Sequence, residues 1–163
     1  MRIAGRRSTI TIHRVRPYSS IRKRLYAAAA IVALLGLADG IYLTVEHVTG
    51  RTAECIASSG CQDVLSSKYA AIGPVPLAAV GAFAYFTAFS LAVLAAFGYR
   101  KCGAFFALLL GIMFATTLWL IYLQAFVLHA FCDYCLFSAG VTTVLSGIAI
   151  ANTLLRDRIP SAH

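Results

Sequence analysis

The chain has 163 residues, of which 60% are hydrophobic and only 12% are charged, and its mean hydropathy is +0.80. Soluble domains are roughly 45–50% apolar and about 25% charged, so this composition excludes an ordinary soluble domain and is typical of a membrane protein. The formal net charge is +8, but the basic residues gather before residue 25. That distribution favours a cytoplasmic tail beside a membrane helix over a nucleic-acid-binding surface.

Four apolar stretches are long enough to cross a membrane. A helix needs roughly 20 apolar residues to span the hydrocarbon core. A cleaved signal peptide is the alternative for the first stretch, but its apolar run is longer than the usual 7–15 residues. We therefore predict an all-α protein, a four-transmembrane-helix bundle, with spans at Leu25–Val45, Val75–Tyr99, Gly103–Leu128 and Leu136–Leu155.

The positions of the basic residues predict how the bundle is oriented. With the N-terminus inside, only Arg51 and Lys68 lie in an outer segment, as the positive-inside rule requires. We expect a cytoplasmic N-terminal tail at 1–24, a membrane domain at 25–155 and a cytoplasmic C-terminal tail at 156–163. The protein is then a multi-pass protein of the cell membrane.

The outer loop at 46–74 is the one long connection between the spans. Because the other two connections are short, a function that reaches beyond the membrane is expected here. The segment "CQDVLSSKYAAI", residues 61–72, places apolar residues on one side of a helix. It predicts a short helix lying at the membrane interface.

The five cysteines separate into two pairs and one single residue. Cys55 and Cys61 lie in the outer loop, and Cys132 and Cys135 lie at the start of the fourth span, on the same side. Disulfides persist on that side, whereas Cys102 faces the reducing cytosol. We interpret Cys102 as a small apolar packing residue.

The C-x-x-C pair favours redox chemistry over a structural role. At a helix N-terminus, unpaired backbone N–H groups and the helix dipole stabilise a thiolate, which is the species that attacks disulfides. A disulfide between Cys132 and Cys135 would close so short a loop that it would stabilise the fold little. Metal binding and inert packing remain alternatives for this pair taken alone.

The second pair extends this interpretation to a relay. Cys55 and Cys61 are separated by "IASSG", a flexible segment that can close a disulfide and exchange it with a neighbouring pair. A four-cysteine zinc site is the alternative, but the wide spacing and the oxidising surroundings disfavour it. No haem, flavin or nucleotide motif is present. A lipid-soluble quinone is the electron acceptor that suits thiols at the edge of a bilayer.

A few polar and aromatic residues lie in or near the spans. Asp39 and Gln124 are expected to face the bundle interior, because polar groups are costly in lipid. His129 and Asp133 flank the thiols, where they either shift a thiol pKa or are solvated at the interface. The aromatic residues that either line a pocket or pack at the interface are Tyr42, Tyr85, Trp119 and Tyr122.

Together these residues resemble the vitamin K epoxide reductase family, in its bacterial branch. The matching features are Cys55 and Cys61, Ser67, "GPVPLAAVGAFAYF" and "YLQAFVLHAFCDYC", and the resemblance covers about 26–155. The quinone-coupled disulfide oxidases of the DsbB type also combine four helices with two cysteine pairs. In that family the C-x-x-C lies in the first outer loop, whereas here it comes last.

The resemblance implies a role for each of these residues. Cys132 and Cys135 would be the active-site pair, with Cys135 nearest a quinone headgroup held within the bundle. Cys55 and Cys61 would be the shuttle pair that exchanges with a thioredoxin-like (DsbA-like) protein. Ser67 matches the loop serine or threonine that hydrogen-bonds near the quinone. Menaquinone and ubiquinone are both open, and no metal is implied.

Two departures from the family limit what the resemblance implies. Many bacterial members carry a fused thioredoxin-like domain, which this chain lacks, so we expect a separate partner. Leu77 and Ala139 stand where the animal enzymes have an asparagine and a tyrosine, which argues against epoxide reduction. The predicted function is an integral membrane thiol–disulfide oxidoreductase that passes electrons from the partner to a quinone and supports disulfide bond formation. The alternative is a non-catalytic scaffold with structural outer disulfides.

Overall fold

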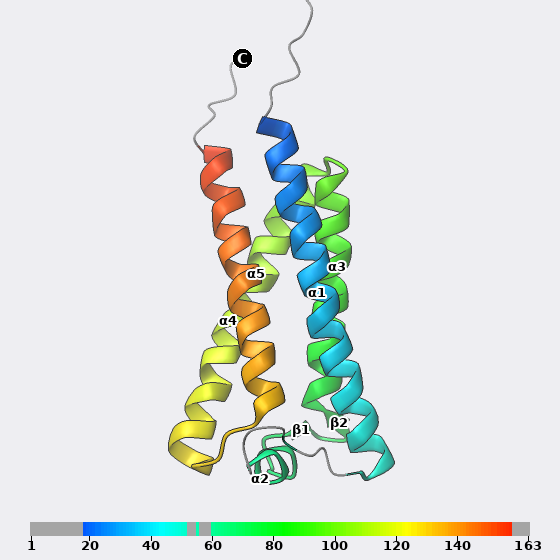
Figure 1. Cartoon of the computed structure of the whole chain (residues 1–163), viewed down its shortest axis with the longest axis vertical. Helices are drawn as coiled ribbons and strands as arrows, with labels where there is room; N and C mark the ends of the chain where they lie inside the picture. The colour runs from blue at the N-terminus through cyan, green and yellow to red at the C-terminus, as the bar shows by residue number, and fades with distance from the viewer. Residues whose placement is uncertain (1–17, 52–54, 56–59, 158–163) are drawn as a thin grey trace, which may run out of the picture.

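The computed structural model describes residues 18–51, 55 and 60–157. Four long helices form an antiparallel bundle (Figure 1), and each is apolar and long enough to cross a membrane, as predicted. A six-residue π-helical segment, η1, continues α4. The bounds are α1 Tyr18–Thr49, α3 Leu77–Ala96, α4 Arg100–Tyr122, η1 Leu123–Leu128 and α5 Asp133–Asp157. The chain is thus a multi-pass membrane protein with an all-α bundle.

The helix ends differ from the predicted spans because hydropathy marks only the part of a helix that suits lipid. α1 begins before the predicted Leu25, since arginine and lysine are good helix formers and extend the helix beyond its apolar part. α3 begins later than the predicted Val75, because Val75 and Pro76 form a strand instead. The predicted terminal tails lie largely outside the described residues.

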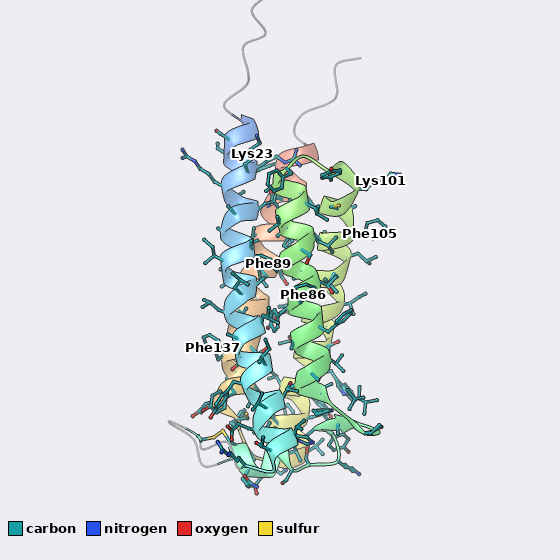
Figure 2. All side chains as sticks on the ribbon, turned by 90° about the vertical axis from the view of Figure 1, so that its right-hand side faces the viewer. Lys23, Phe86, Phe89, Lys101, Phe105 and Phe137 are labelled. Carbon is teal, nitrogen blue, oxygen red and sulfur yellow. A yellow bond between two sulfur atoms is a disulfide. The ribbon has the colours of Figure 1, made fainter. Side chains whose placement is uncertain are left out.

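Small side chains form the contact between α1 and α3. Ala29 and Ala33 on α1 and Ala88 and Ala92 on α3 are fully buried, which lets these two helices approach closely. Larger side chains fill the rest of the core, where Phe106, Leu110 and Leu145 are also buried. Many other large apolar side chains face outward: Phe86 is 53% exposed and Phe105 is 59% exposed, and Figure 2 shows both on the outer surface of the bundle. An apolar exterior is the arrangement expected in lipid.

A short cap covers one end of the bundle, which we call the thiol end. It comprises α2 (Cys61–Leu65) and an antiparallel pair of two-residue strands, β1 (Ala71–Ile72) and β2 (Val75–Pro76). Figure 1 places this cap opposite the start of α1 and the end of α5. Lys23 and Lys101 lie at that opposite end (Figure 2).

The predicted helix at 61–72 is confirmed only over Cys61–Leu65. The rest was wrong, because the chain turns after Leu65: Ser67 N–H bonds the Val64 carbonyl at 3.3 Å, and Ala70 N–H bonds the Ser67 carbonyl at 2.9 Å. These three-residue turns replace the i to i−4 pattern of an α-helix. Gly73 then adopts a positive φ of 62°, which turns the chain so that β1 and β2 pair.

Candidate thiol–disulfide site

Cys132 occupies the N-cap position of α5, as the C-x-x-C pattern predicted. Its carbonyl accepts the hydrogen bond of Leu136 N–H at 3.0 Å, and its side chain is fully buried. A hydrogen bond from the Cys135 thiol, together with backbone N–H groups of Cys135 and Tyr134, outweighs desolvation and lowers the pKa of Cys132 to about 7. The two backbone donors are unpaired N–H groups of the helix start, so this position favours a thiolate.

The π-helical segment η1 positions Cys132. Gln124 is buried in η1, as expected from its sequence context, and its side-chain oxygen accepts a hydrogen bond from the backbone N–H of Cys132 at 3.0 Å. His129 has a positive φ of 50°, and Ala130 N–H bonds the Gln124 carbonyl at 3.2 Å. The π-helical turn η1 therefore ends the third long helix, and the chain continues directly to the start of α5.

Cys55 and Cys61 form a disulfide, with their Cα atoms 5.6 Å apart. Cys61 is the first residue of α2 and is 1% exposed, whereas Cys55 is half-buried. The backbone N–H of Cys61 also points at the Cys55 sulfur, at 3.1 Å. The residues between the two cysteines, except Gly60, lie outside the described residues.

Gly60 allows the loop pair to approach the C-x-x-C segment. A Cβ atom at Gly60 would lie 2.8 Å from both the backbone N and the backbone O of Phe131, closer than carbon can pack. Only glycine leaves room for this contact. The backbone before Cys61 therefore lies directly against the backbone before Cys132.

The structure brings all four predicted thiol residues into one cluster. Cys61 and Cys132 are buried together with Val64, and Cys55 and Cys135 pack against them. Cys102 lies apart from them, in the first turn of α4 at the opposite end of the bundle (Figure 1). Thiol–disulfide exchange requires direct contact between sulfurs, and this cluster provides the neighbourhood for it.

A cavity of about 500 Å³ lies among α1, α3, α4 and α5 at the thiol end. Of the four clustered cysteines, only Cys135 is among the described residues that line it, and Ser67 lines it from the loop. Its walls are mainly apolar. The polar side chains in its wall include those of Asp39, Gln124, Ser138 and Thr142.

Of the four aromatic residues singled out from the sequence, Tyr85 lines this cavity. Its hydroxyl lies 2.8 Å from Thr142 Oγ1 and donates to the Ser138 carbonyl at 2.9 Å, so it joins α3 to α5. Trp119 and Tyr122 stack on each other with centroids 5.9 Å apart, and both are exposed on the outer surface. Tyr42 is exposed and packs against Tyr134.

Asp133 has a position that the sequence did not reveal. Its carboxylate and the sulfurs of Cys55 and Cys61 all lie within 4.8 Å of one another. Three such groups resemble a metal site, but both sulfurs are joined in a disulfide, and the thiolate is the form that binds metals. The structure therefore places a carboxylate, that of Asp133, beside the loop disulfide.

A four-helix membrane bundle with a thiol pair at a helix N-terminus and a disulfide packed against it defines a membrane thiol–disulfide oxidoreductase. A sequence model of the Vitamin K epoxide reductase family matches residues 27–150, which covers most of the four long helices and includes both cysteine pairs. The chain belongs to this family.

Proposed function

We propose that the protein oxidises a thioredoxin-like partner outside the cytoplasm and passes the electrons to a quinone in the membrane. In this reaction the protein partner exchanges with the loop pair, Cys55 and Cys61, and the quinone oxidises the C-x-x-C pair. The observation that carries it is the cavity, because Cys135 alone among the four clustered cysteines lines that space. Disulfide bond formation in exported proteins is the process this reaction supports.

The first half-reaction takes place at the loop disulfide. A thiolate of the reduced partner attacks Cys55, which is the more exposed of the two sulfur-bearing residues, and Cys61 leaves as a thiolate that takes up a proton in its buried position. The second thiol of the partner then displaces Cys55. The partner gains a disulfide, and the loop pair has taken up its two electrons.

The second half-reaction transfers these electrons to the C-x-x-C pair. The Cys61 sulfur attacks the oxidised Cys132–Cys135 disulfide at Cys132, with which it shares a buried cluster, and Cys135 leaves as a thiolate. Cys55 then displaces Cys132 from the mixed disulfide, and the loop disulfide re-forms. Cys132 leaves readily because its thiolate is stabilised by the start of α5.

The last step occurs in the cavity. Oxidation of the Cys132–Cys135 dithiol to a disulfide gives two electrons and two protons, which convert the quinone to a quinol. A cavity of about 500 Å³ falls within the roughly 300–1,000 Å³ range of small-molecule pockets. Ser67 contributes a hydroxyl to this wall; it accepts a hydrogen bond from a quinol as it stands, and donates to a quinone oxygen by exchanging its bond to the Val64 carbonyl.

The orientation in the membrane follows from the charges. We place the thiol end outside and both termini in the cytoplasm. Lys23 and Lys101 lie at the end away from the thiols (Figure 2), and basic residues favour the cytoplasmic side. The thiol pairs then face the compartment in which disulfides persist.

The experiment mixes purified protein with a reduced thioredoxin-like protein and menadione, and follows quinone reduction by absorbance. Wild-type protein is expected to turn over, and Cys135→Ala is expected to lose quinone reduction while its loop disulfide still accepts electrons. Cys102→Ala is the matched control and keeps full activity. Normal turnover in Cys135→Ala would disprove the mechanism.

A further inference from the structure

We propose that the Asp133 carboxylate accepts the proton of the loop dithiol when that dithiol is oxidised by the C-x-x-C pair. This role deepens the proposed function, since it concerns the exchange between the two cysteine pairs. The observation that supports this role is the position of the carboxylate, whose oxygen lies within 4.8 Å of both loop sulfurs.

The fold places this carboxylate beside the loop pair. Asp133 is the first residue of α5 and Cys61 is the first residue of α2. The close contact of Gly60 with Phe131 brings these two helix starts together. Asp133 remains half-exposed, so a proton that it takes up can pass on to water.

The exchange step needs a base at this place. A thiolate attacks disulfides, and a thiol does so far more slowly. The ordinary cysteine pKa of about 8.5 leaves only a few per cent of thiolate at neutral pH. Cys61 is in addition 1% exposed, and burial disfavours a charged group. A carboxylate beside the sulfur removes the proton as the sulfur attacks.

The atoms and electrons balance as follows. The Cys61 S–H proton passes to the Asp133 carboxylate while the sulfur bonds to Cys132, and the Cys132–Cys135 bond breaks to release a Cys135 thiolate. The protonated Asp133 loses its proton to water and then accepts the Cys55 proton in the second displacement. The loop dithiol is oxidised to a disulfide, and the C-x-x-C disulfide is reduced.

Other titratable groups lie on the same elements. Asp63 is exposed in the first turn of α2, and His129 precedes α5. Neither belongs to the set of atoms that lie within 4.8 Å of one another around the loop disulfide. Asp133 also stabilises the start of α5 through the helix dipole, so the test must separate catalysis from helix stability.

The experiment measures transfer between the two pairs without a quinone, so that it reports on Asp133 even if quinone reduction fails. Fully oxidised protein is mixed with one equivalent of dithiothreitol and quenched with acid at successive times. Free thiols are alkylated with N-ethylmaleimide, and mass spectrometry of the peptides gives the fraction on each pair. The variants are Asp133→Asn, Asp133→Glu and, as a charge-matched control in α2, Asp63→Asn.

We expect Asp133→Asn to slow transfer from the loop to the C-x-x-C pair at least about tenfold at pH 7, since general-base groups typically contribute 10²–10⁴-fold. The defect is expected to shrink to about twofold at pH 9.5, where hydroxide is abundant enough to take the place of the carboxylate as base. Asp133→Glu keeps part of the rate, and Asp63→Asn matches wild type.

Two results would overturn the role of Asp133. One is transfer as fast as wild type, or faster, in Asp133→Asn at pH 7. The other is the same slowing at pH 7 and pH 9.5, which would indicate a structural effect. If Asp133→Asn fails to fold by circular dichroism, Asp133→Ser serves instead, because serine is well tolerated at helix starts and also lacks the carboxyl group.

Discussion

The side-chain oxygen of Gln124 accepts a hydrogen bond of 3.0 Å from the backbone N–H of Cys132, across the turn between η1 and α5. Both residues are buried, at 3% and 0% exposure, so neither group can exchange this bond for water. The bond fixes the start of α5, and with it the amide donors that stabilise the Cys132 thiolate. This hydrogen bond explains why a polar residue, Gln124, is buried inside a membrane helix: its side chain satisfies the buried backbone N–H of Cys132.

Replacing Gln124 by leucine is expected to destabilise the fold and slow the enzyme. The Cys132 N–H would remain buried without its partner, which costs about 1–3 kcal/mol. Thermal unfolding in detergent measures the loss of stability, and quinone reduction measures the activity. Gln124→Asn distinguishes the loss of this hydrogen bond from the loss of a polar group, because the shorter asparagine side chain keeps the amide but does not reach Cys132. Unchanged activity in both variants would contradict this role.

The thiolate of Cys132 is expected to titrate near neutral pH. In a variant that keeps only Cys132 and Cys135, the ultraviolet absorbance of thiolate should appear with a midpoint at about 7. The sign follows from the causes, since donors to the sulfur favour the charged form. Adding Cys135→Ala removes the largest cause and should raise the midpoint. A first midpoint at or above the ordinary value of about 8.5 would show that the helix start does not stabilise the thiolate.

Gly60→Ala is expected to separate the two cysteine pairs. The added Cβ would meet two backbone atoms of Phe131 at 2.8 Å, and backbone atoms cannot rotate away. Transfer between the pairs should slow at least about tenfold, since a small misplacement of reacting groups can cost about 10²-fold. The same thiol mapping by alkylation and mass spectrometry reports it.

Gly111→Ala is the control for this substitution. Gly111 lies in α4, and a Cβ there meets nothing within 4 Å. Alanine is expected to be neutral or to stabilise the helix by up to about 1 kcal/mol, with unchanged transfer. Equal rates in Gly60→Ala and Gly111→Ala would mean that the close backbone contact is not needed for exchange.

Ser67→Ala is expected to weaken quinone binding more than it weakens the fold. The hydroxyl already bonds a carbonyl within its own segment, so its loss costs little stability, whereas the cavity loses a polar group from its wall. We expect the KM for menadione to rise about five- to tenfold, as for one neutral hydrogen bond of about 1 kcal/mol. Ser90→Ala in α3, which removes a hydroxyl bonded to its own helix, should leave the KM unchanged.

Much of the fold could be predicted from sequence because lipid imposes a simple pattern. Four apolar stretches gave four helices, and C-x-x-C was correctly expected to open the last one. The helix ends were less accurate, since Pro76 and the polar residues before Leu25 obey local rules that hydropathy does not include. The helix at 61–72 failed beyond Leu65 because the chain forms turns there, ending at Gly73 with its positive φ.

The position of the candidate site was predictable, but its contacts were not. Spacing predicted that Cys132 and Cys135 open the last helix as a reactive pair, and the structure confirms their position; their reactivity stays a prediction. Gln124 was expected to face inward and is buried. Nothing in the spacing could indicate that Gln124 binds the backbone of Cys132, because that contact depends on the π-helical turn. For the same reason, Asp133 looked like a neighbour of its own cysteines, although the packing of α2 against α5 places it beside the loop disulfide.

The cavity wall also has a consequence for side reactions. Quinones with an unsubstituted ring carbon, such as menadione, add covalently to free thiols, so a thiol enzyme that meets one risks permanent alkylation of its own cysteines. Here Cys55, Cys61 and Cys132 are absent from the described lining of the cavity, and Cys135 alone borders it. In the proposed reaction, an oxidant dissolved in lipid and a protein substrate dissolved in water would thus approach different sulfurs. This separation would protect the loop thiols from covalent inactivation while they are reduced.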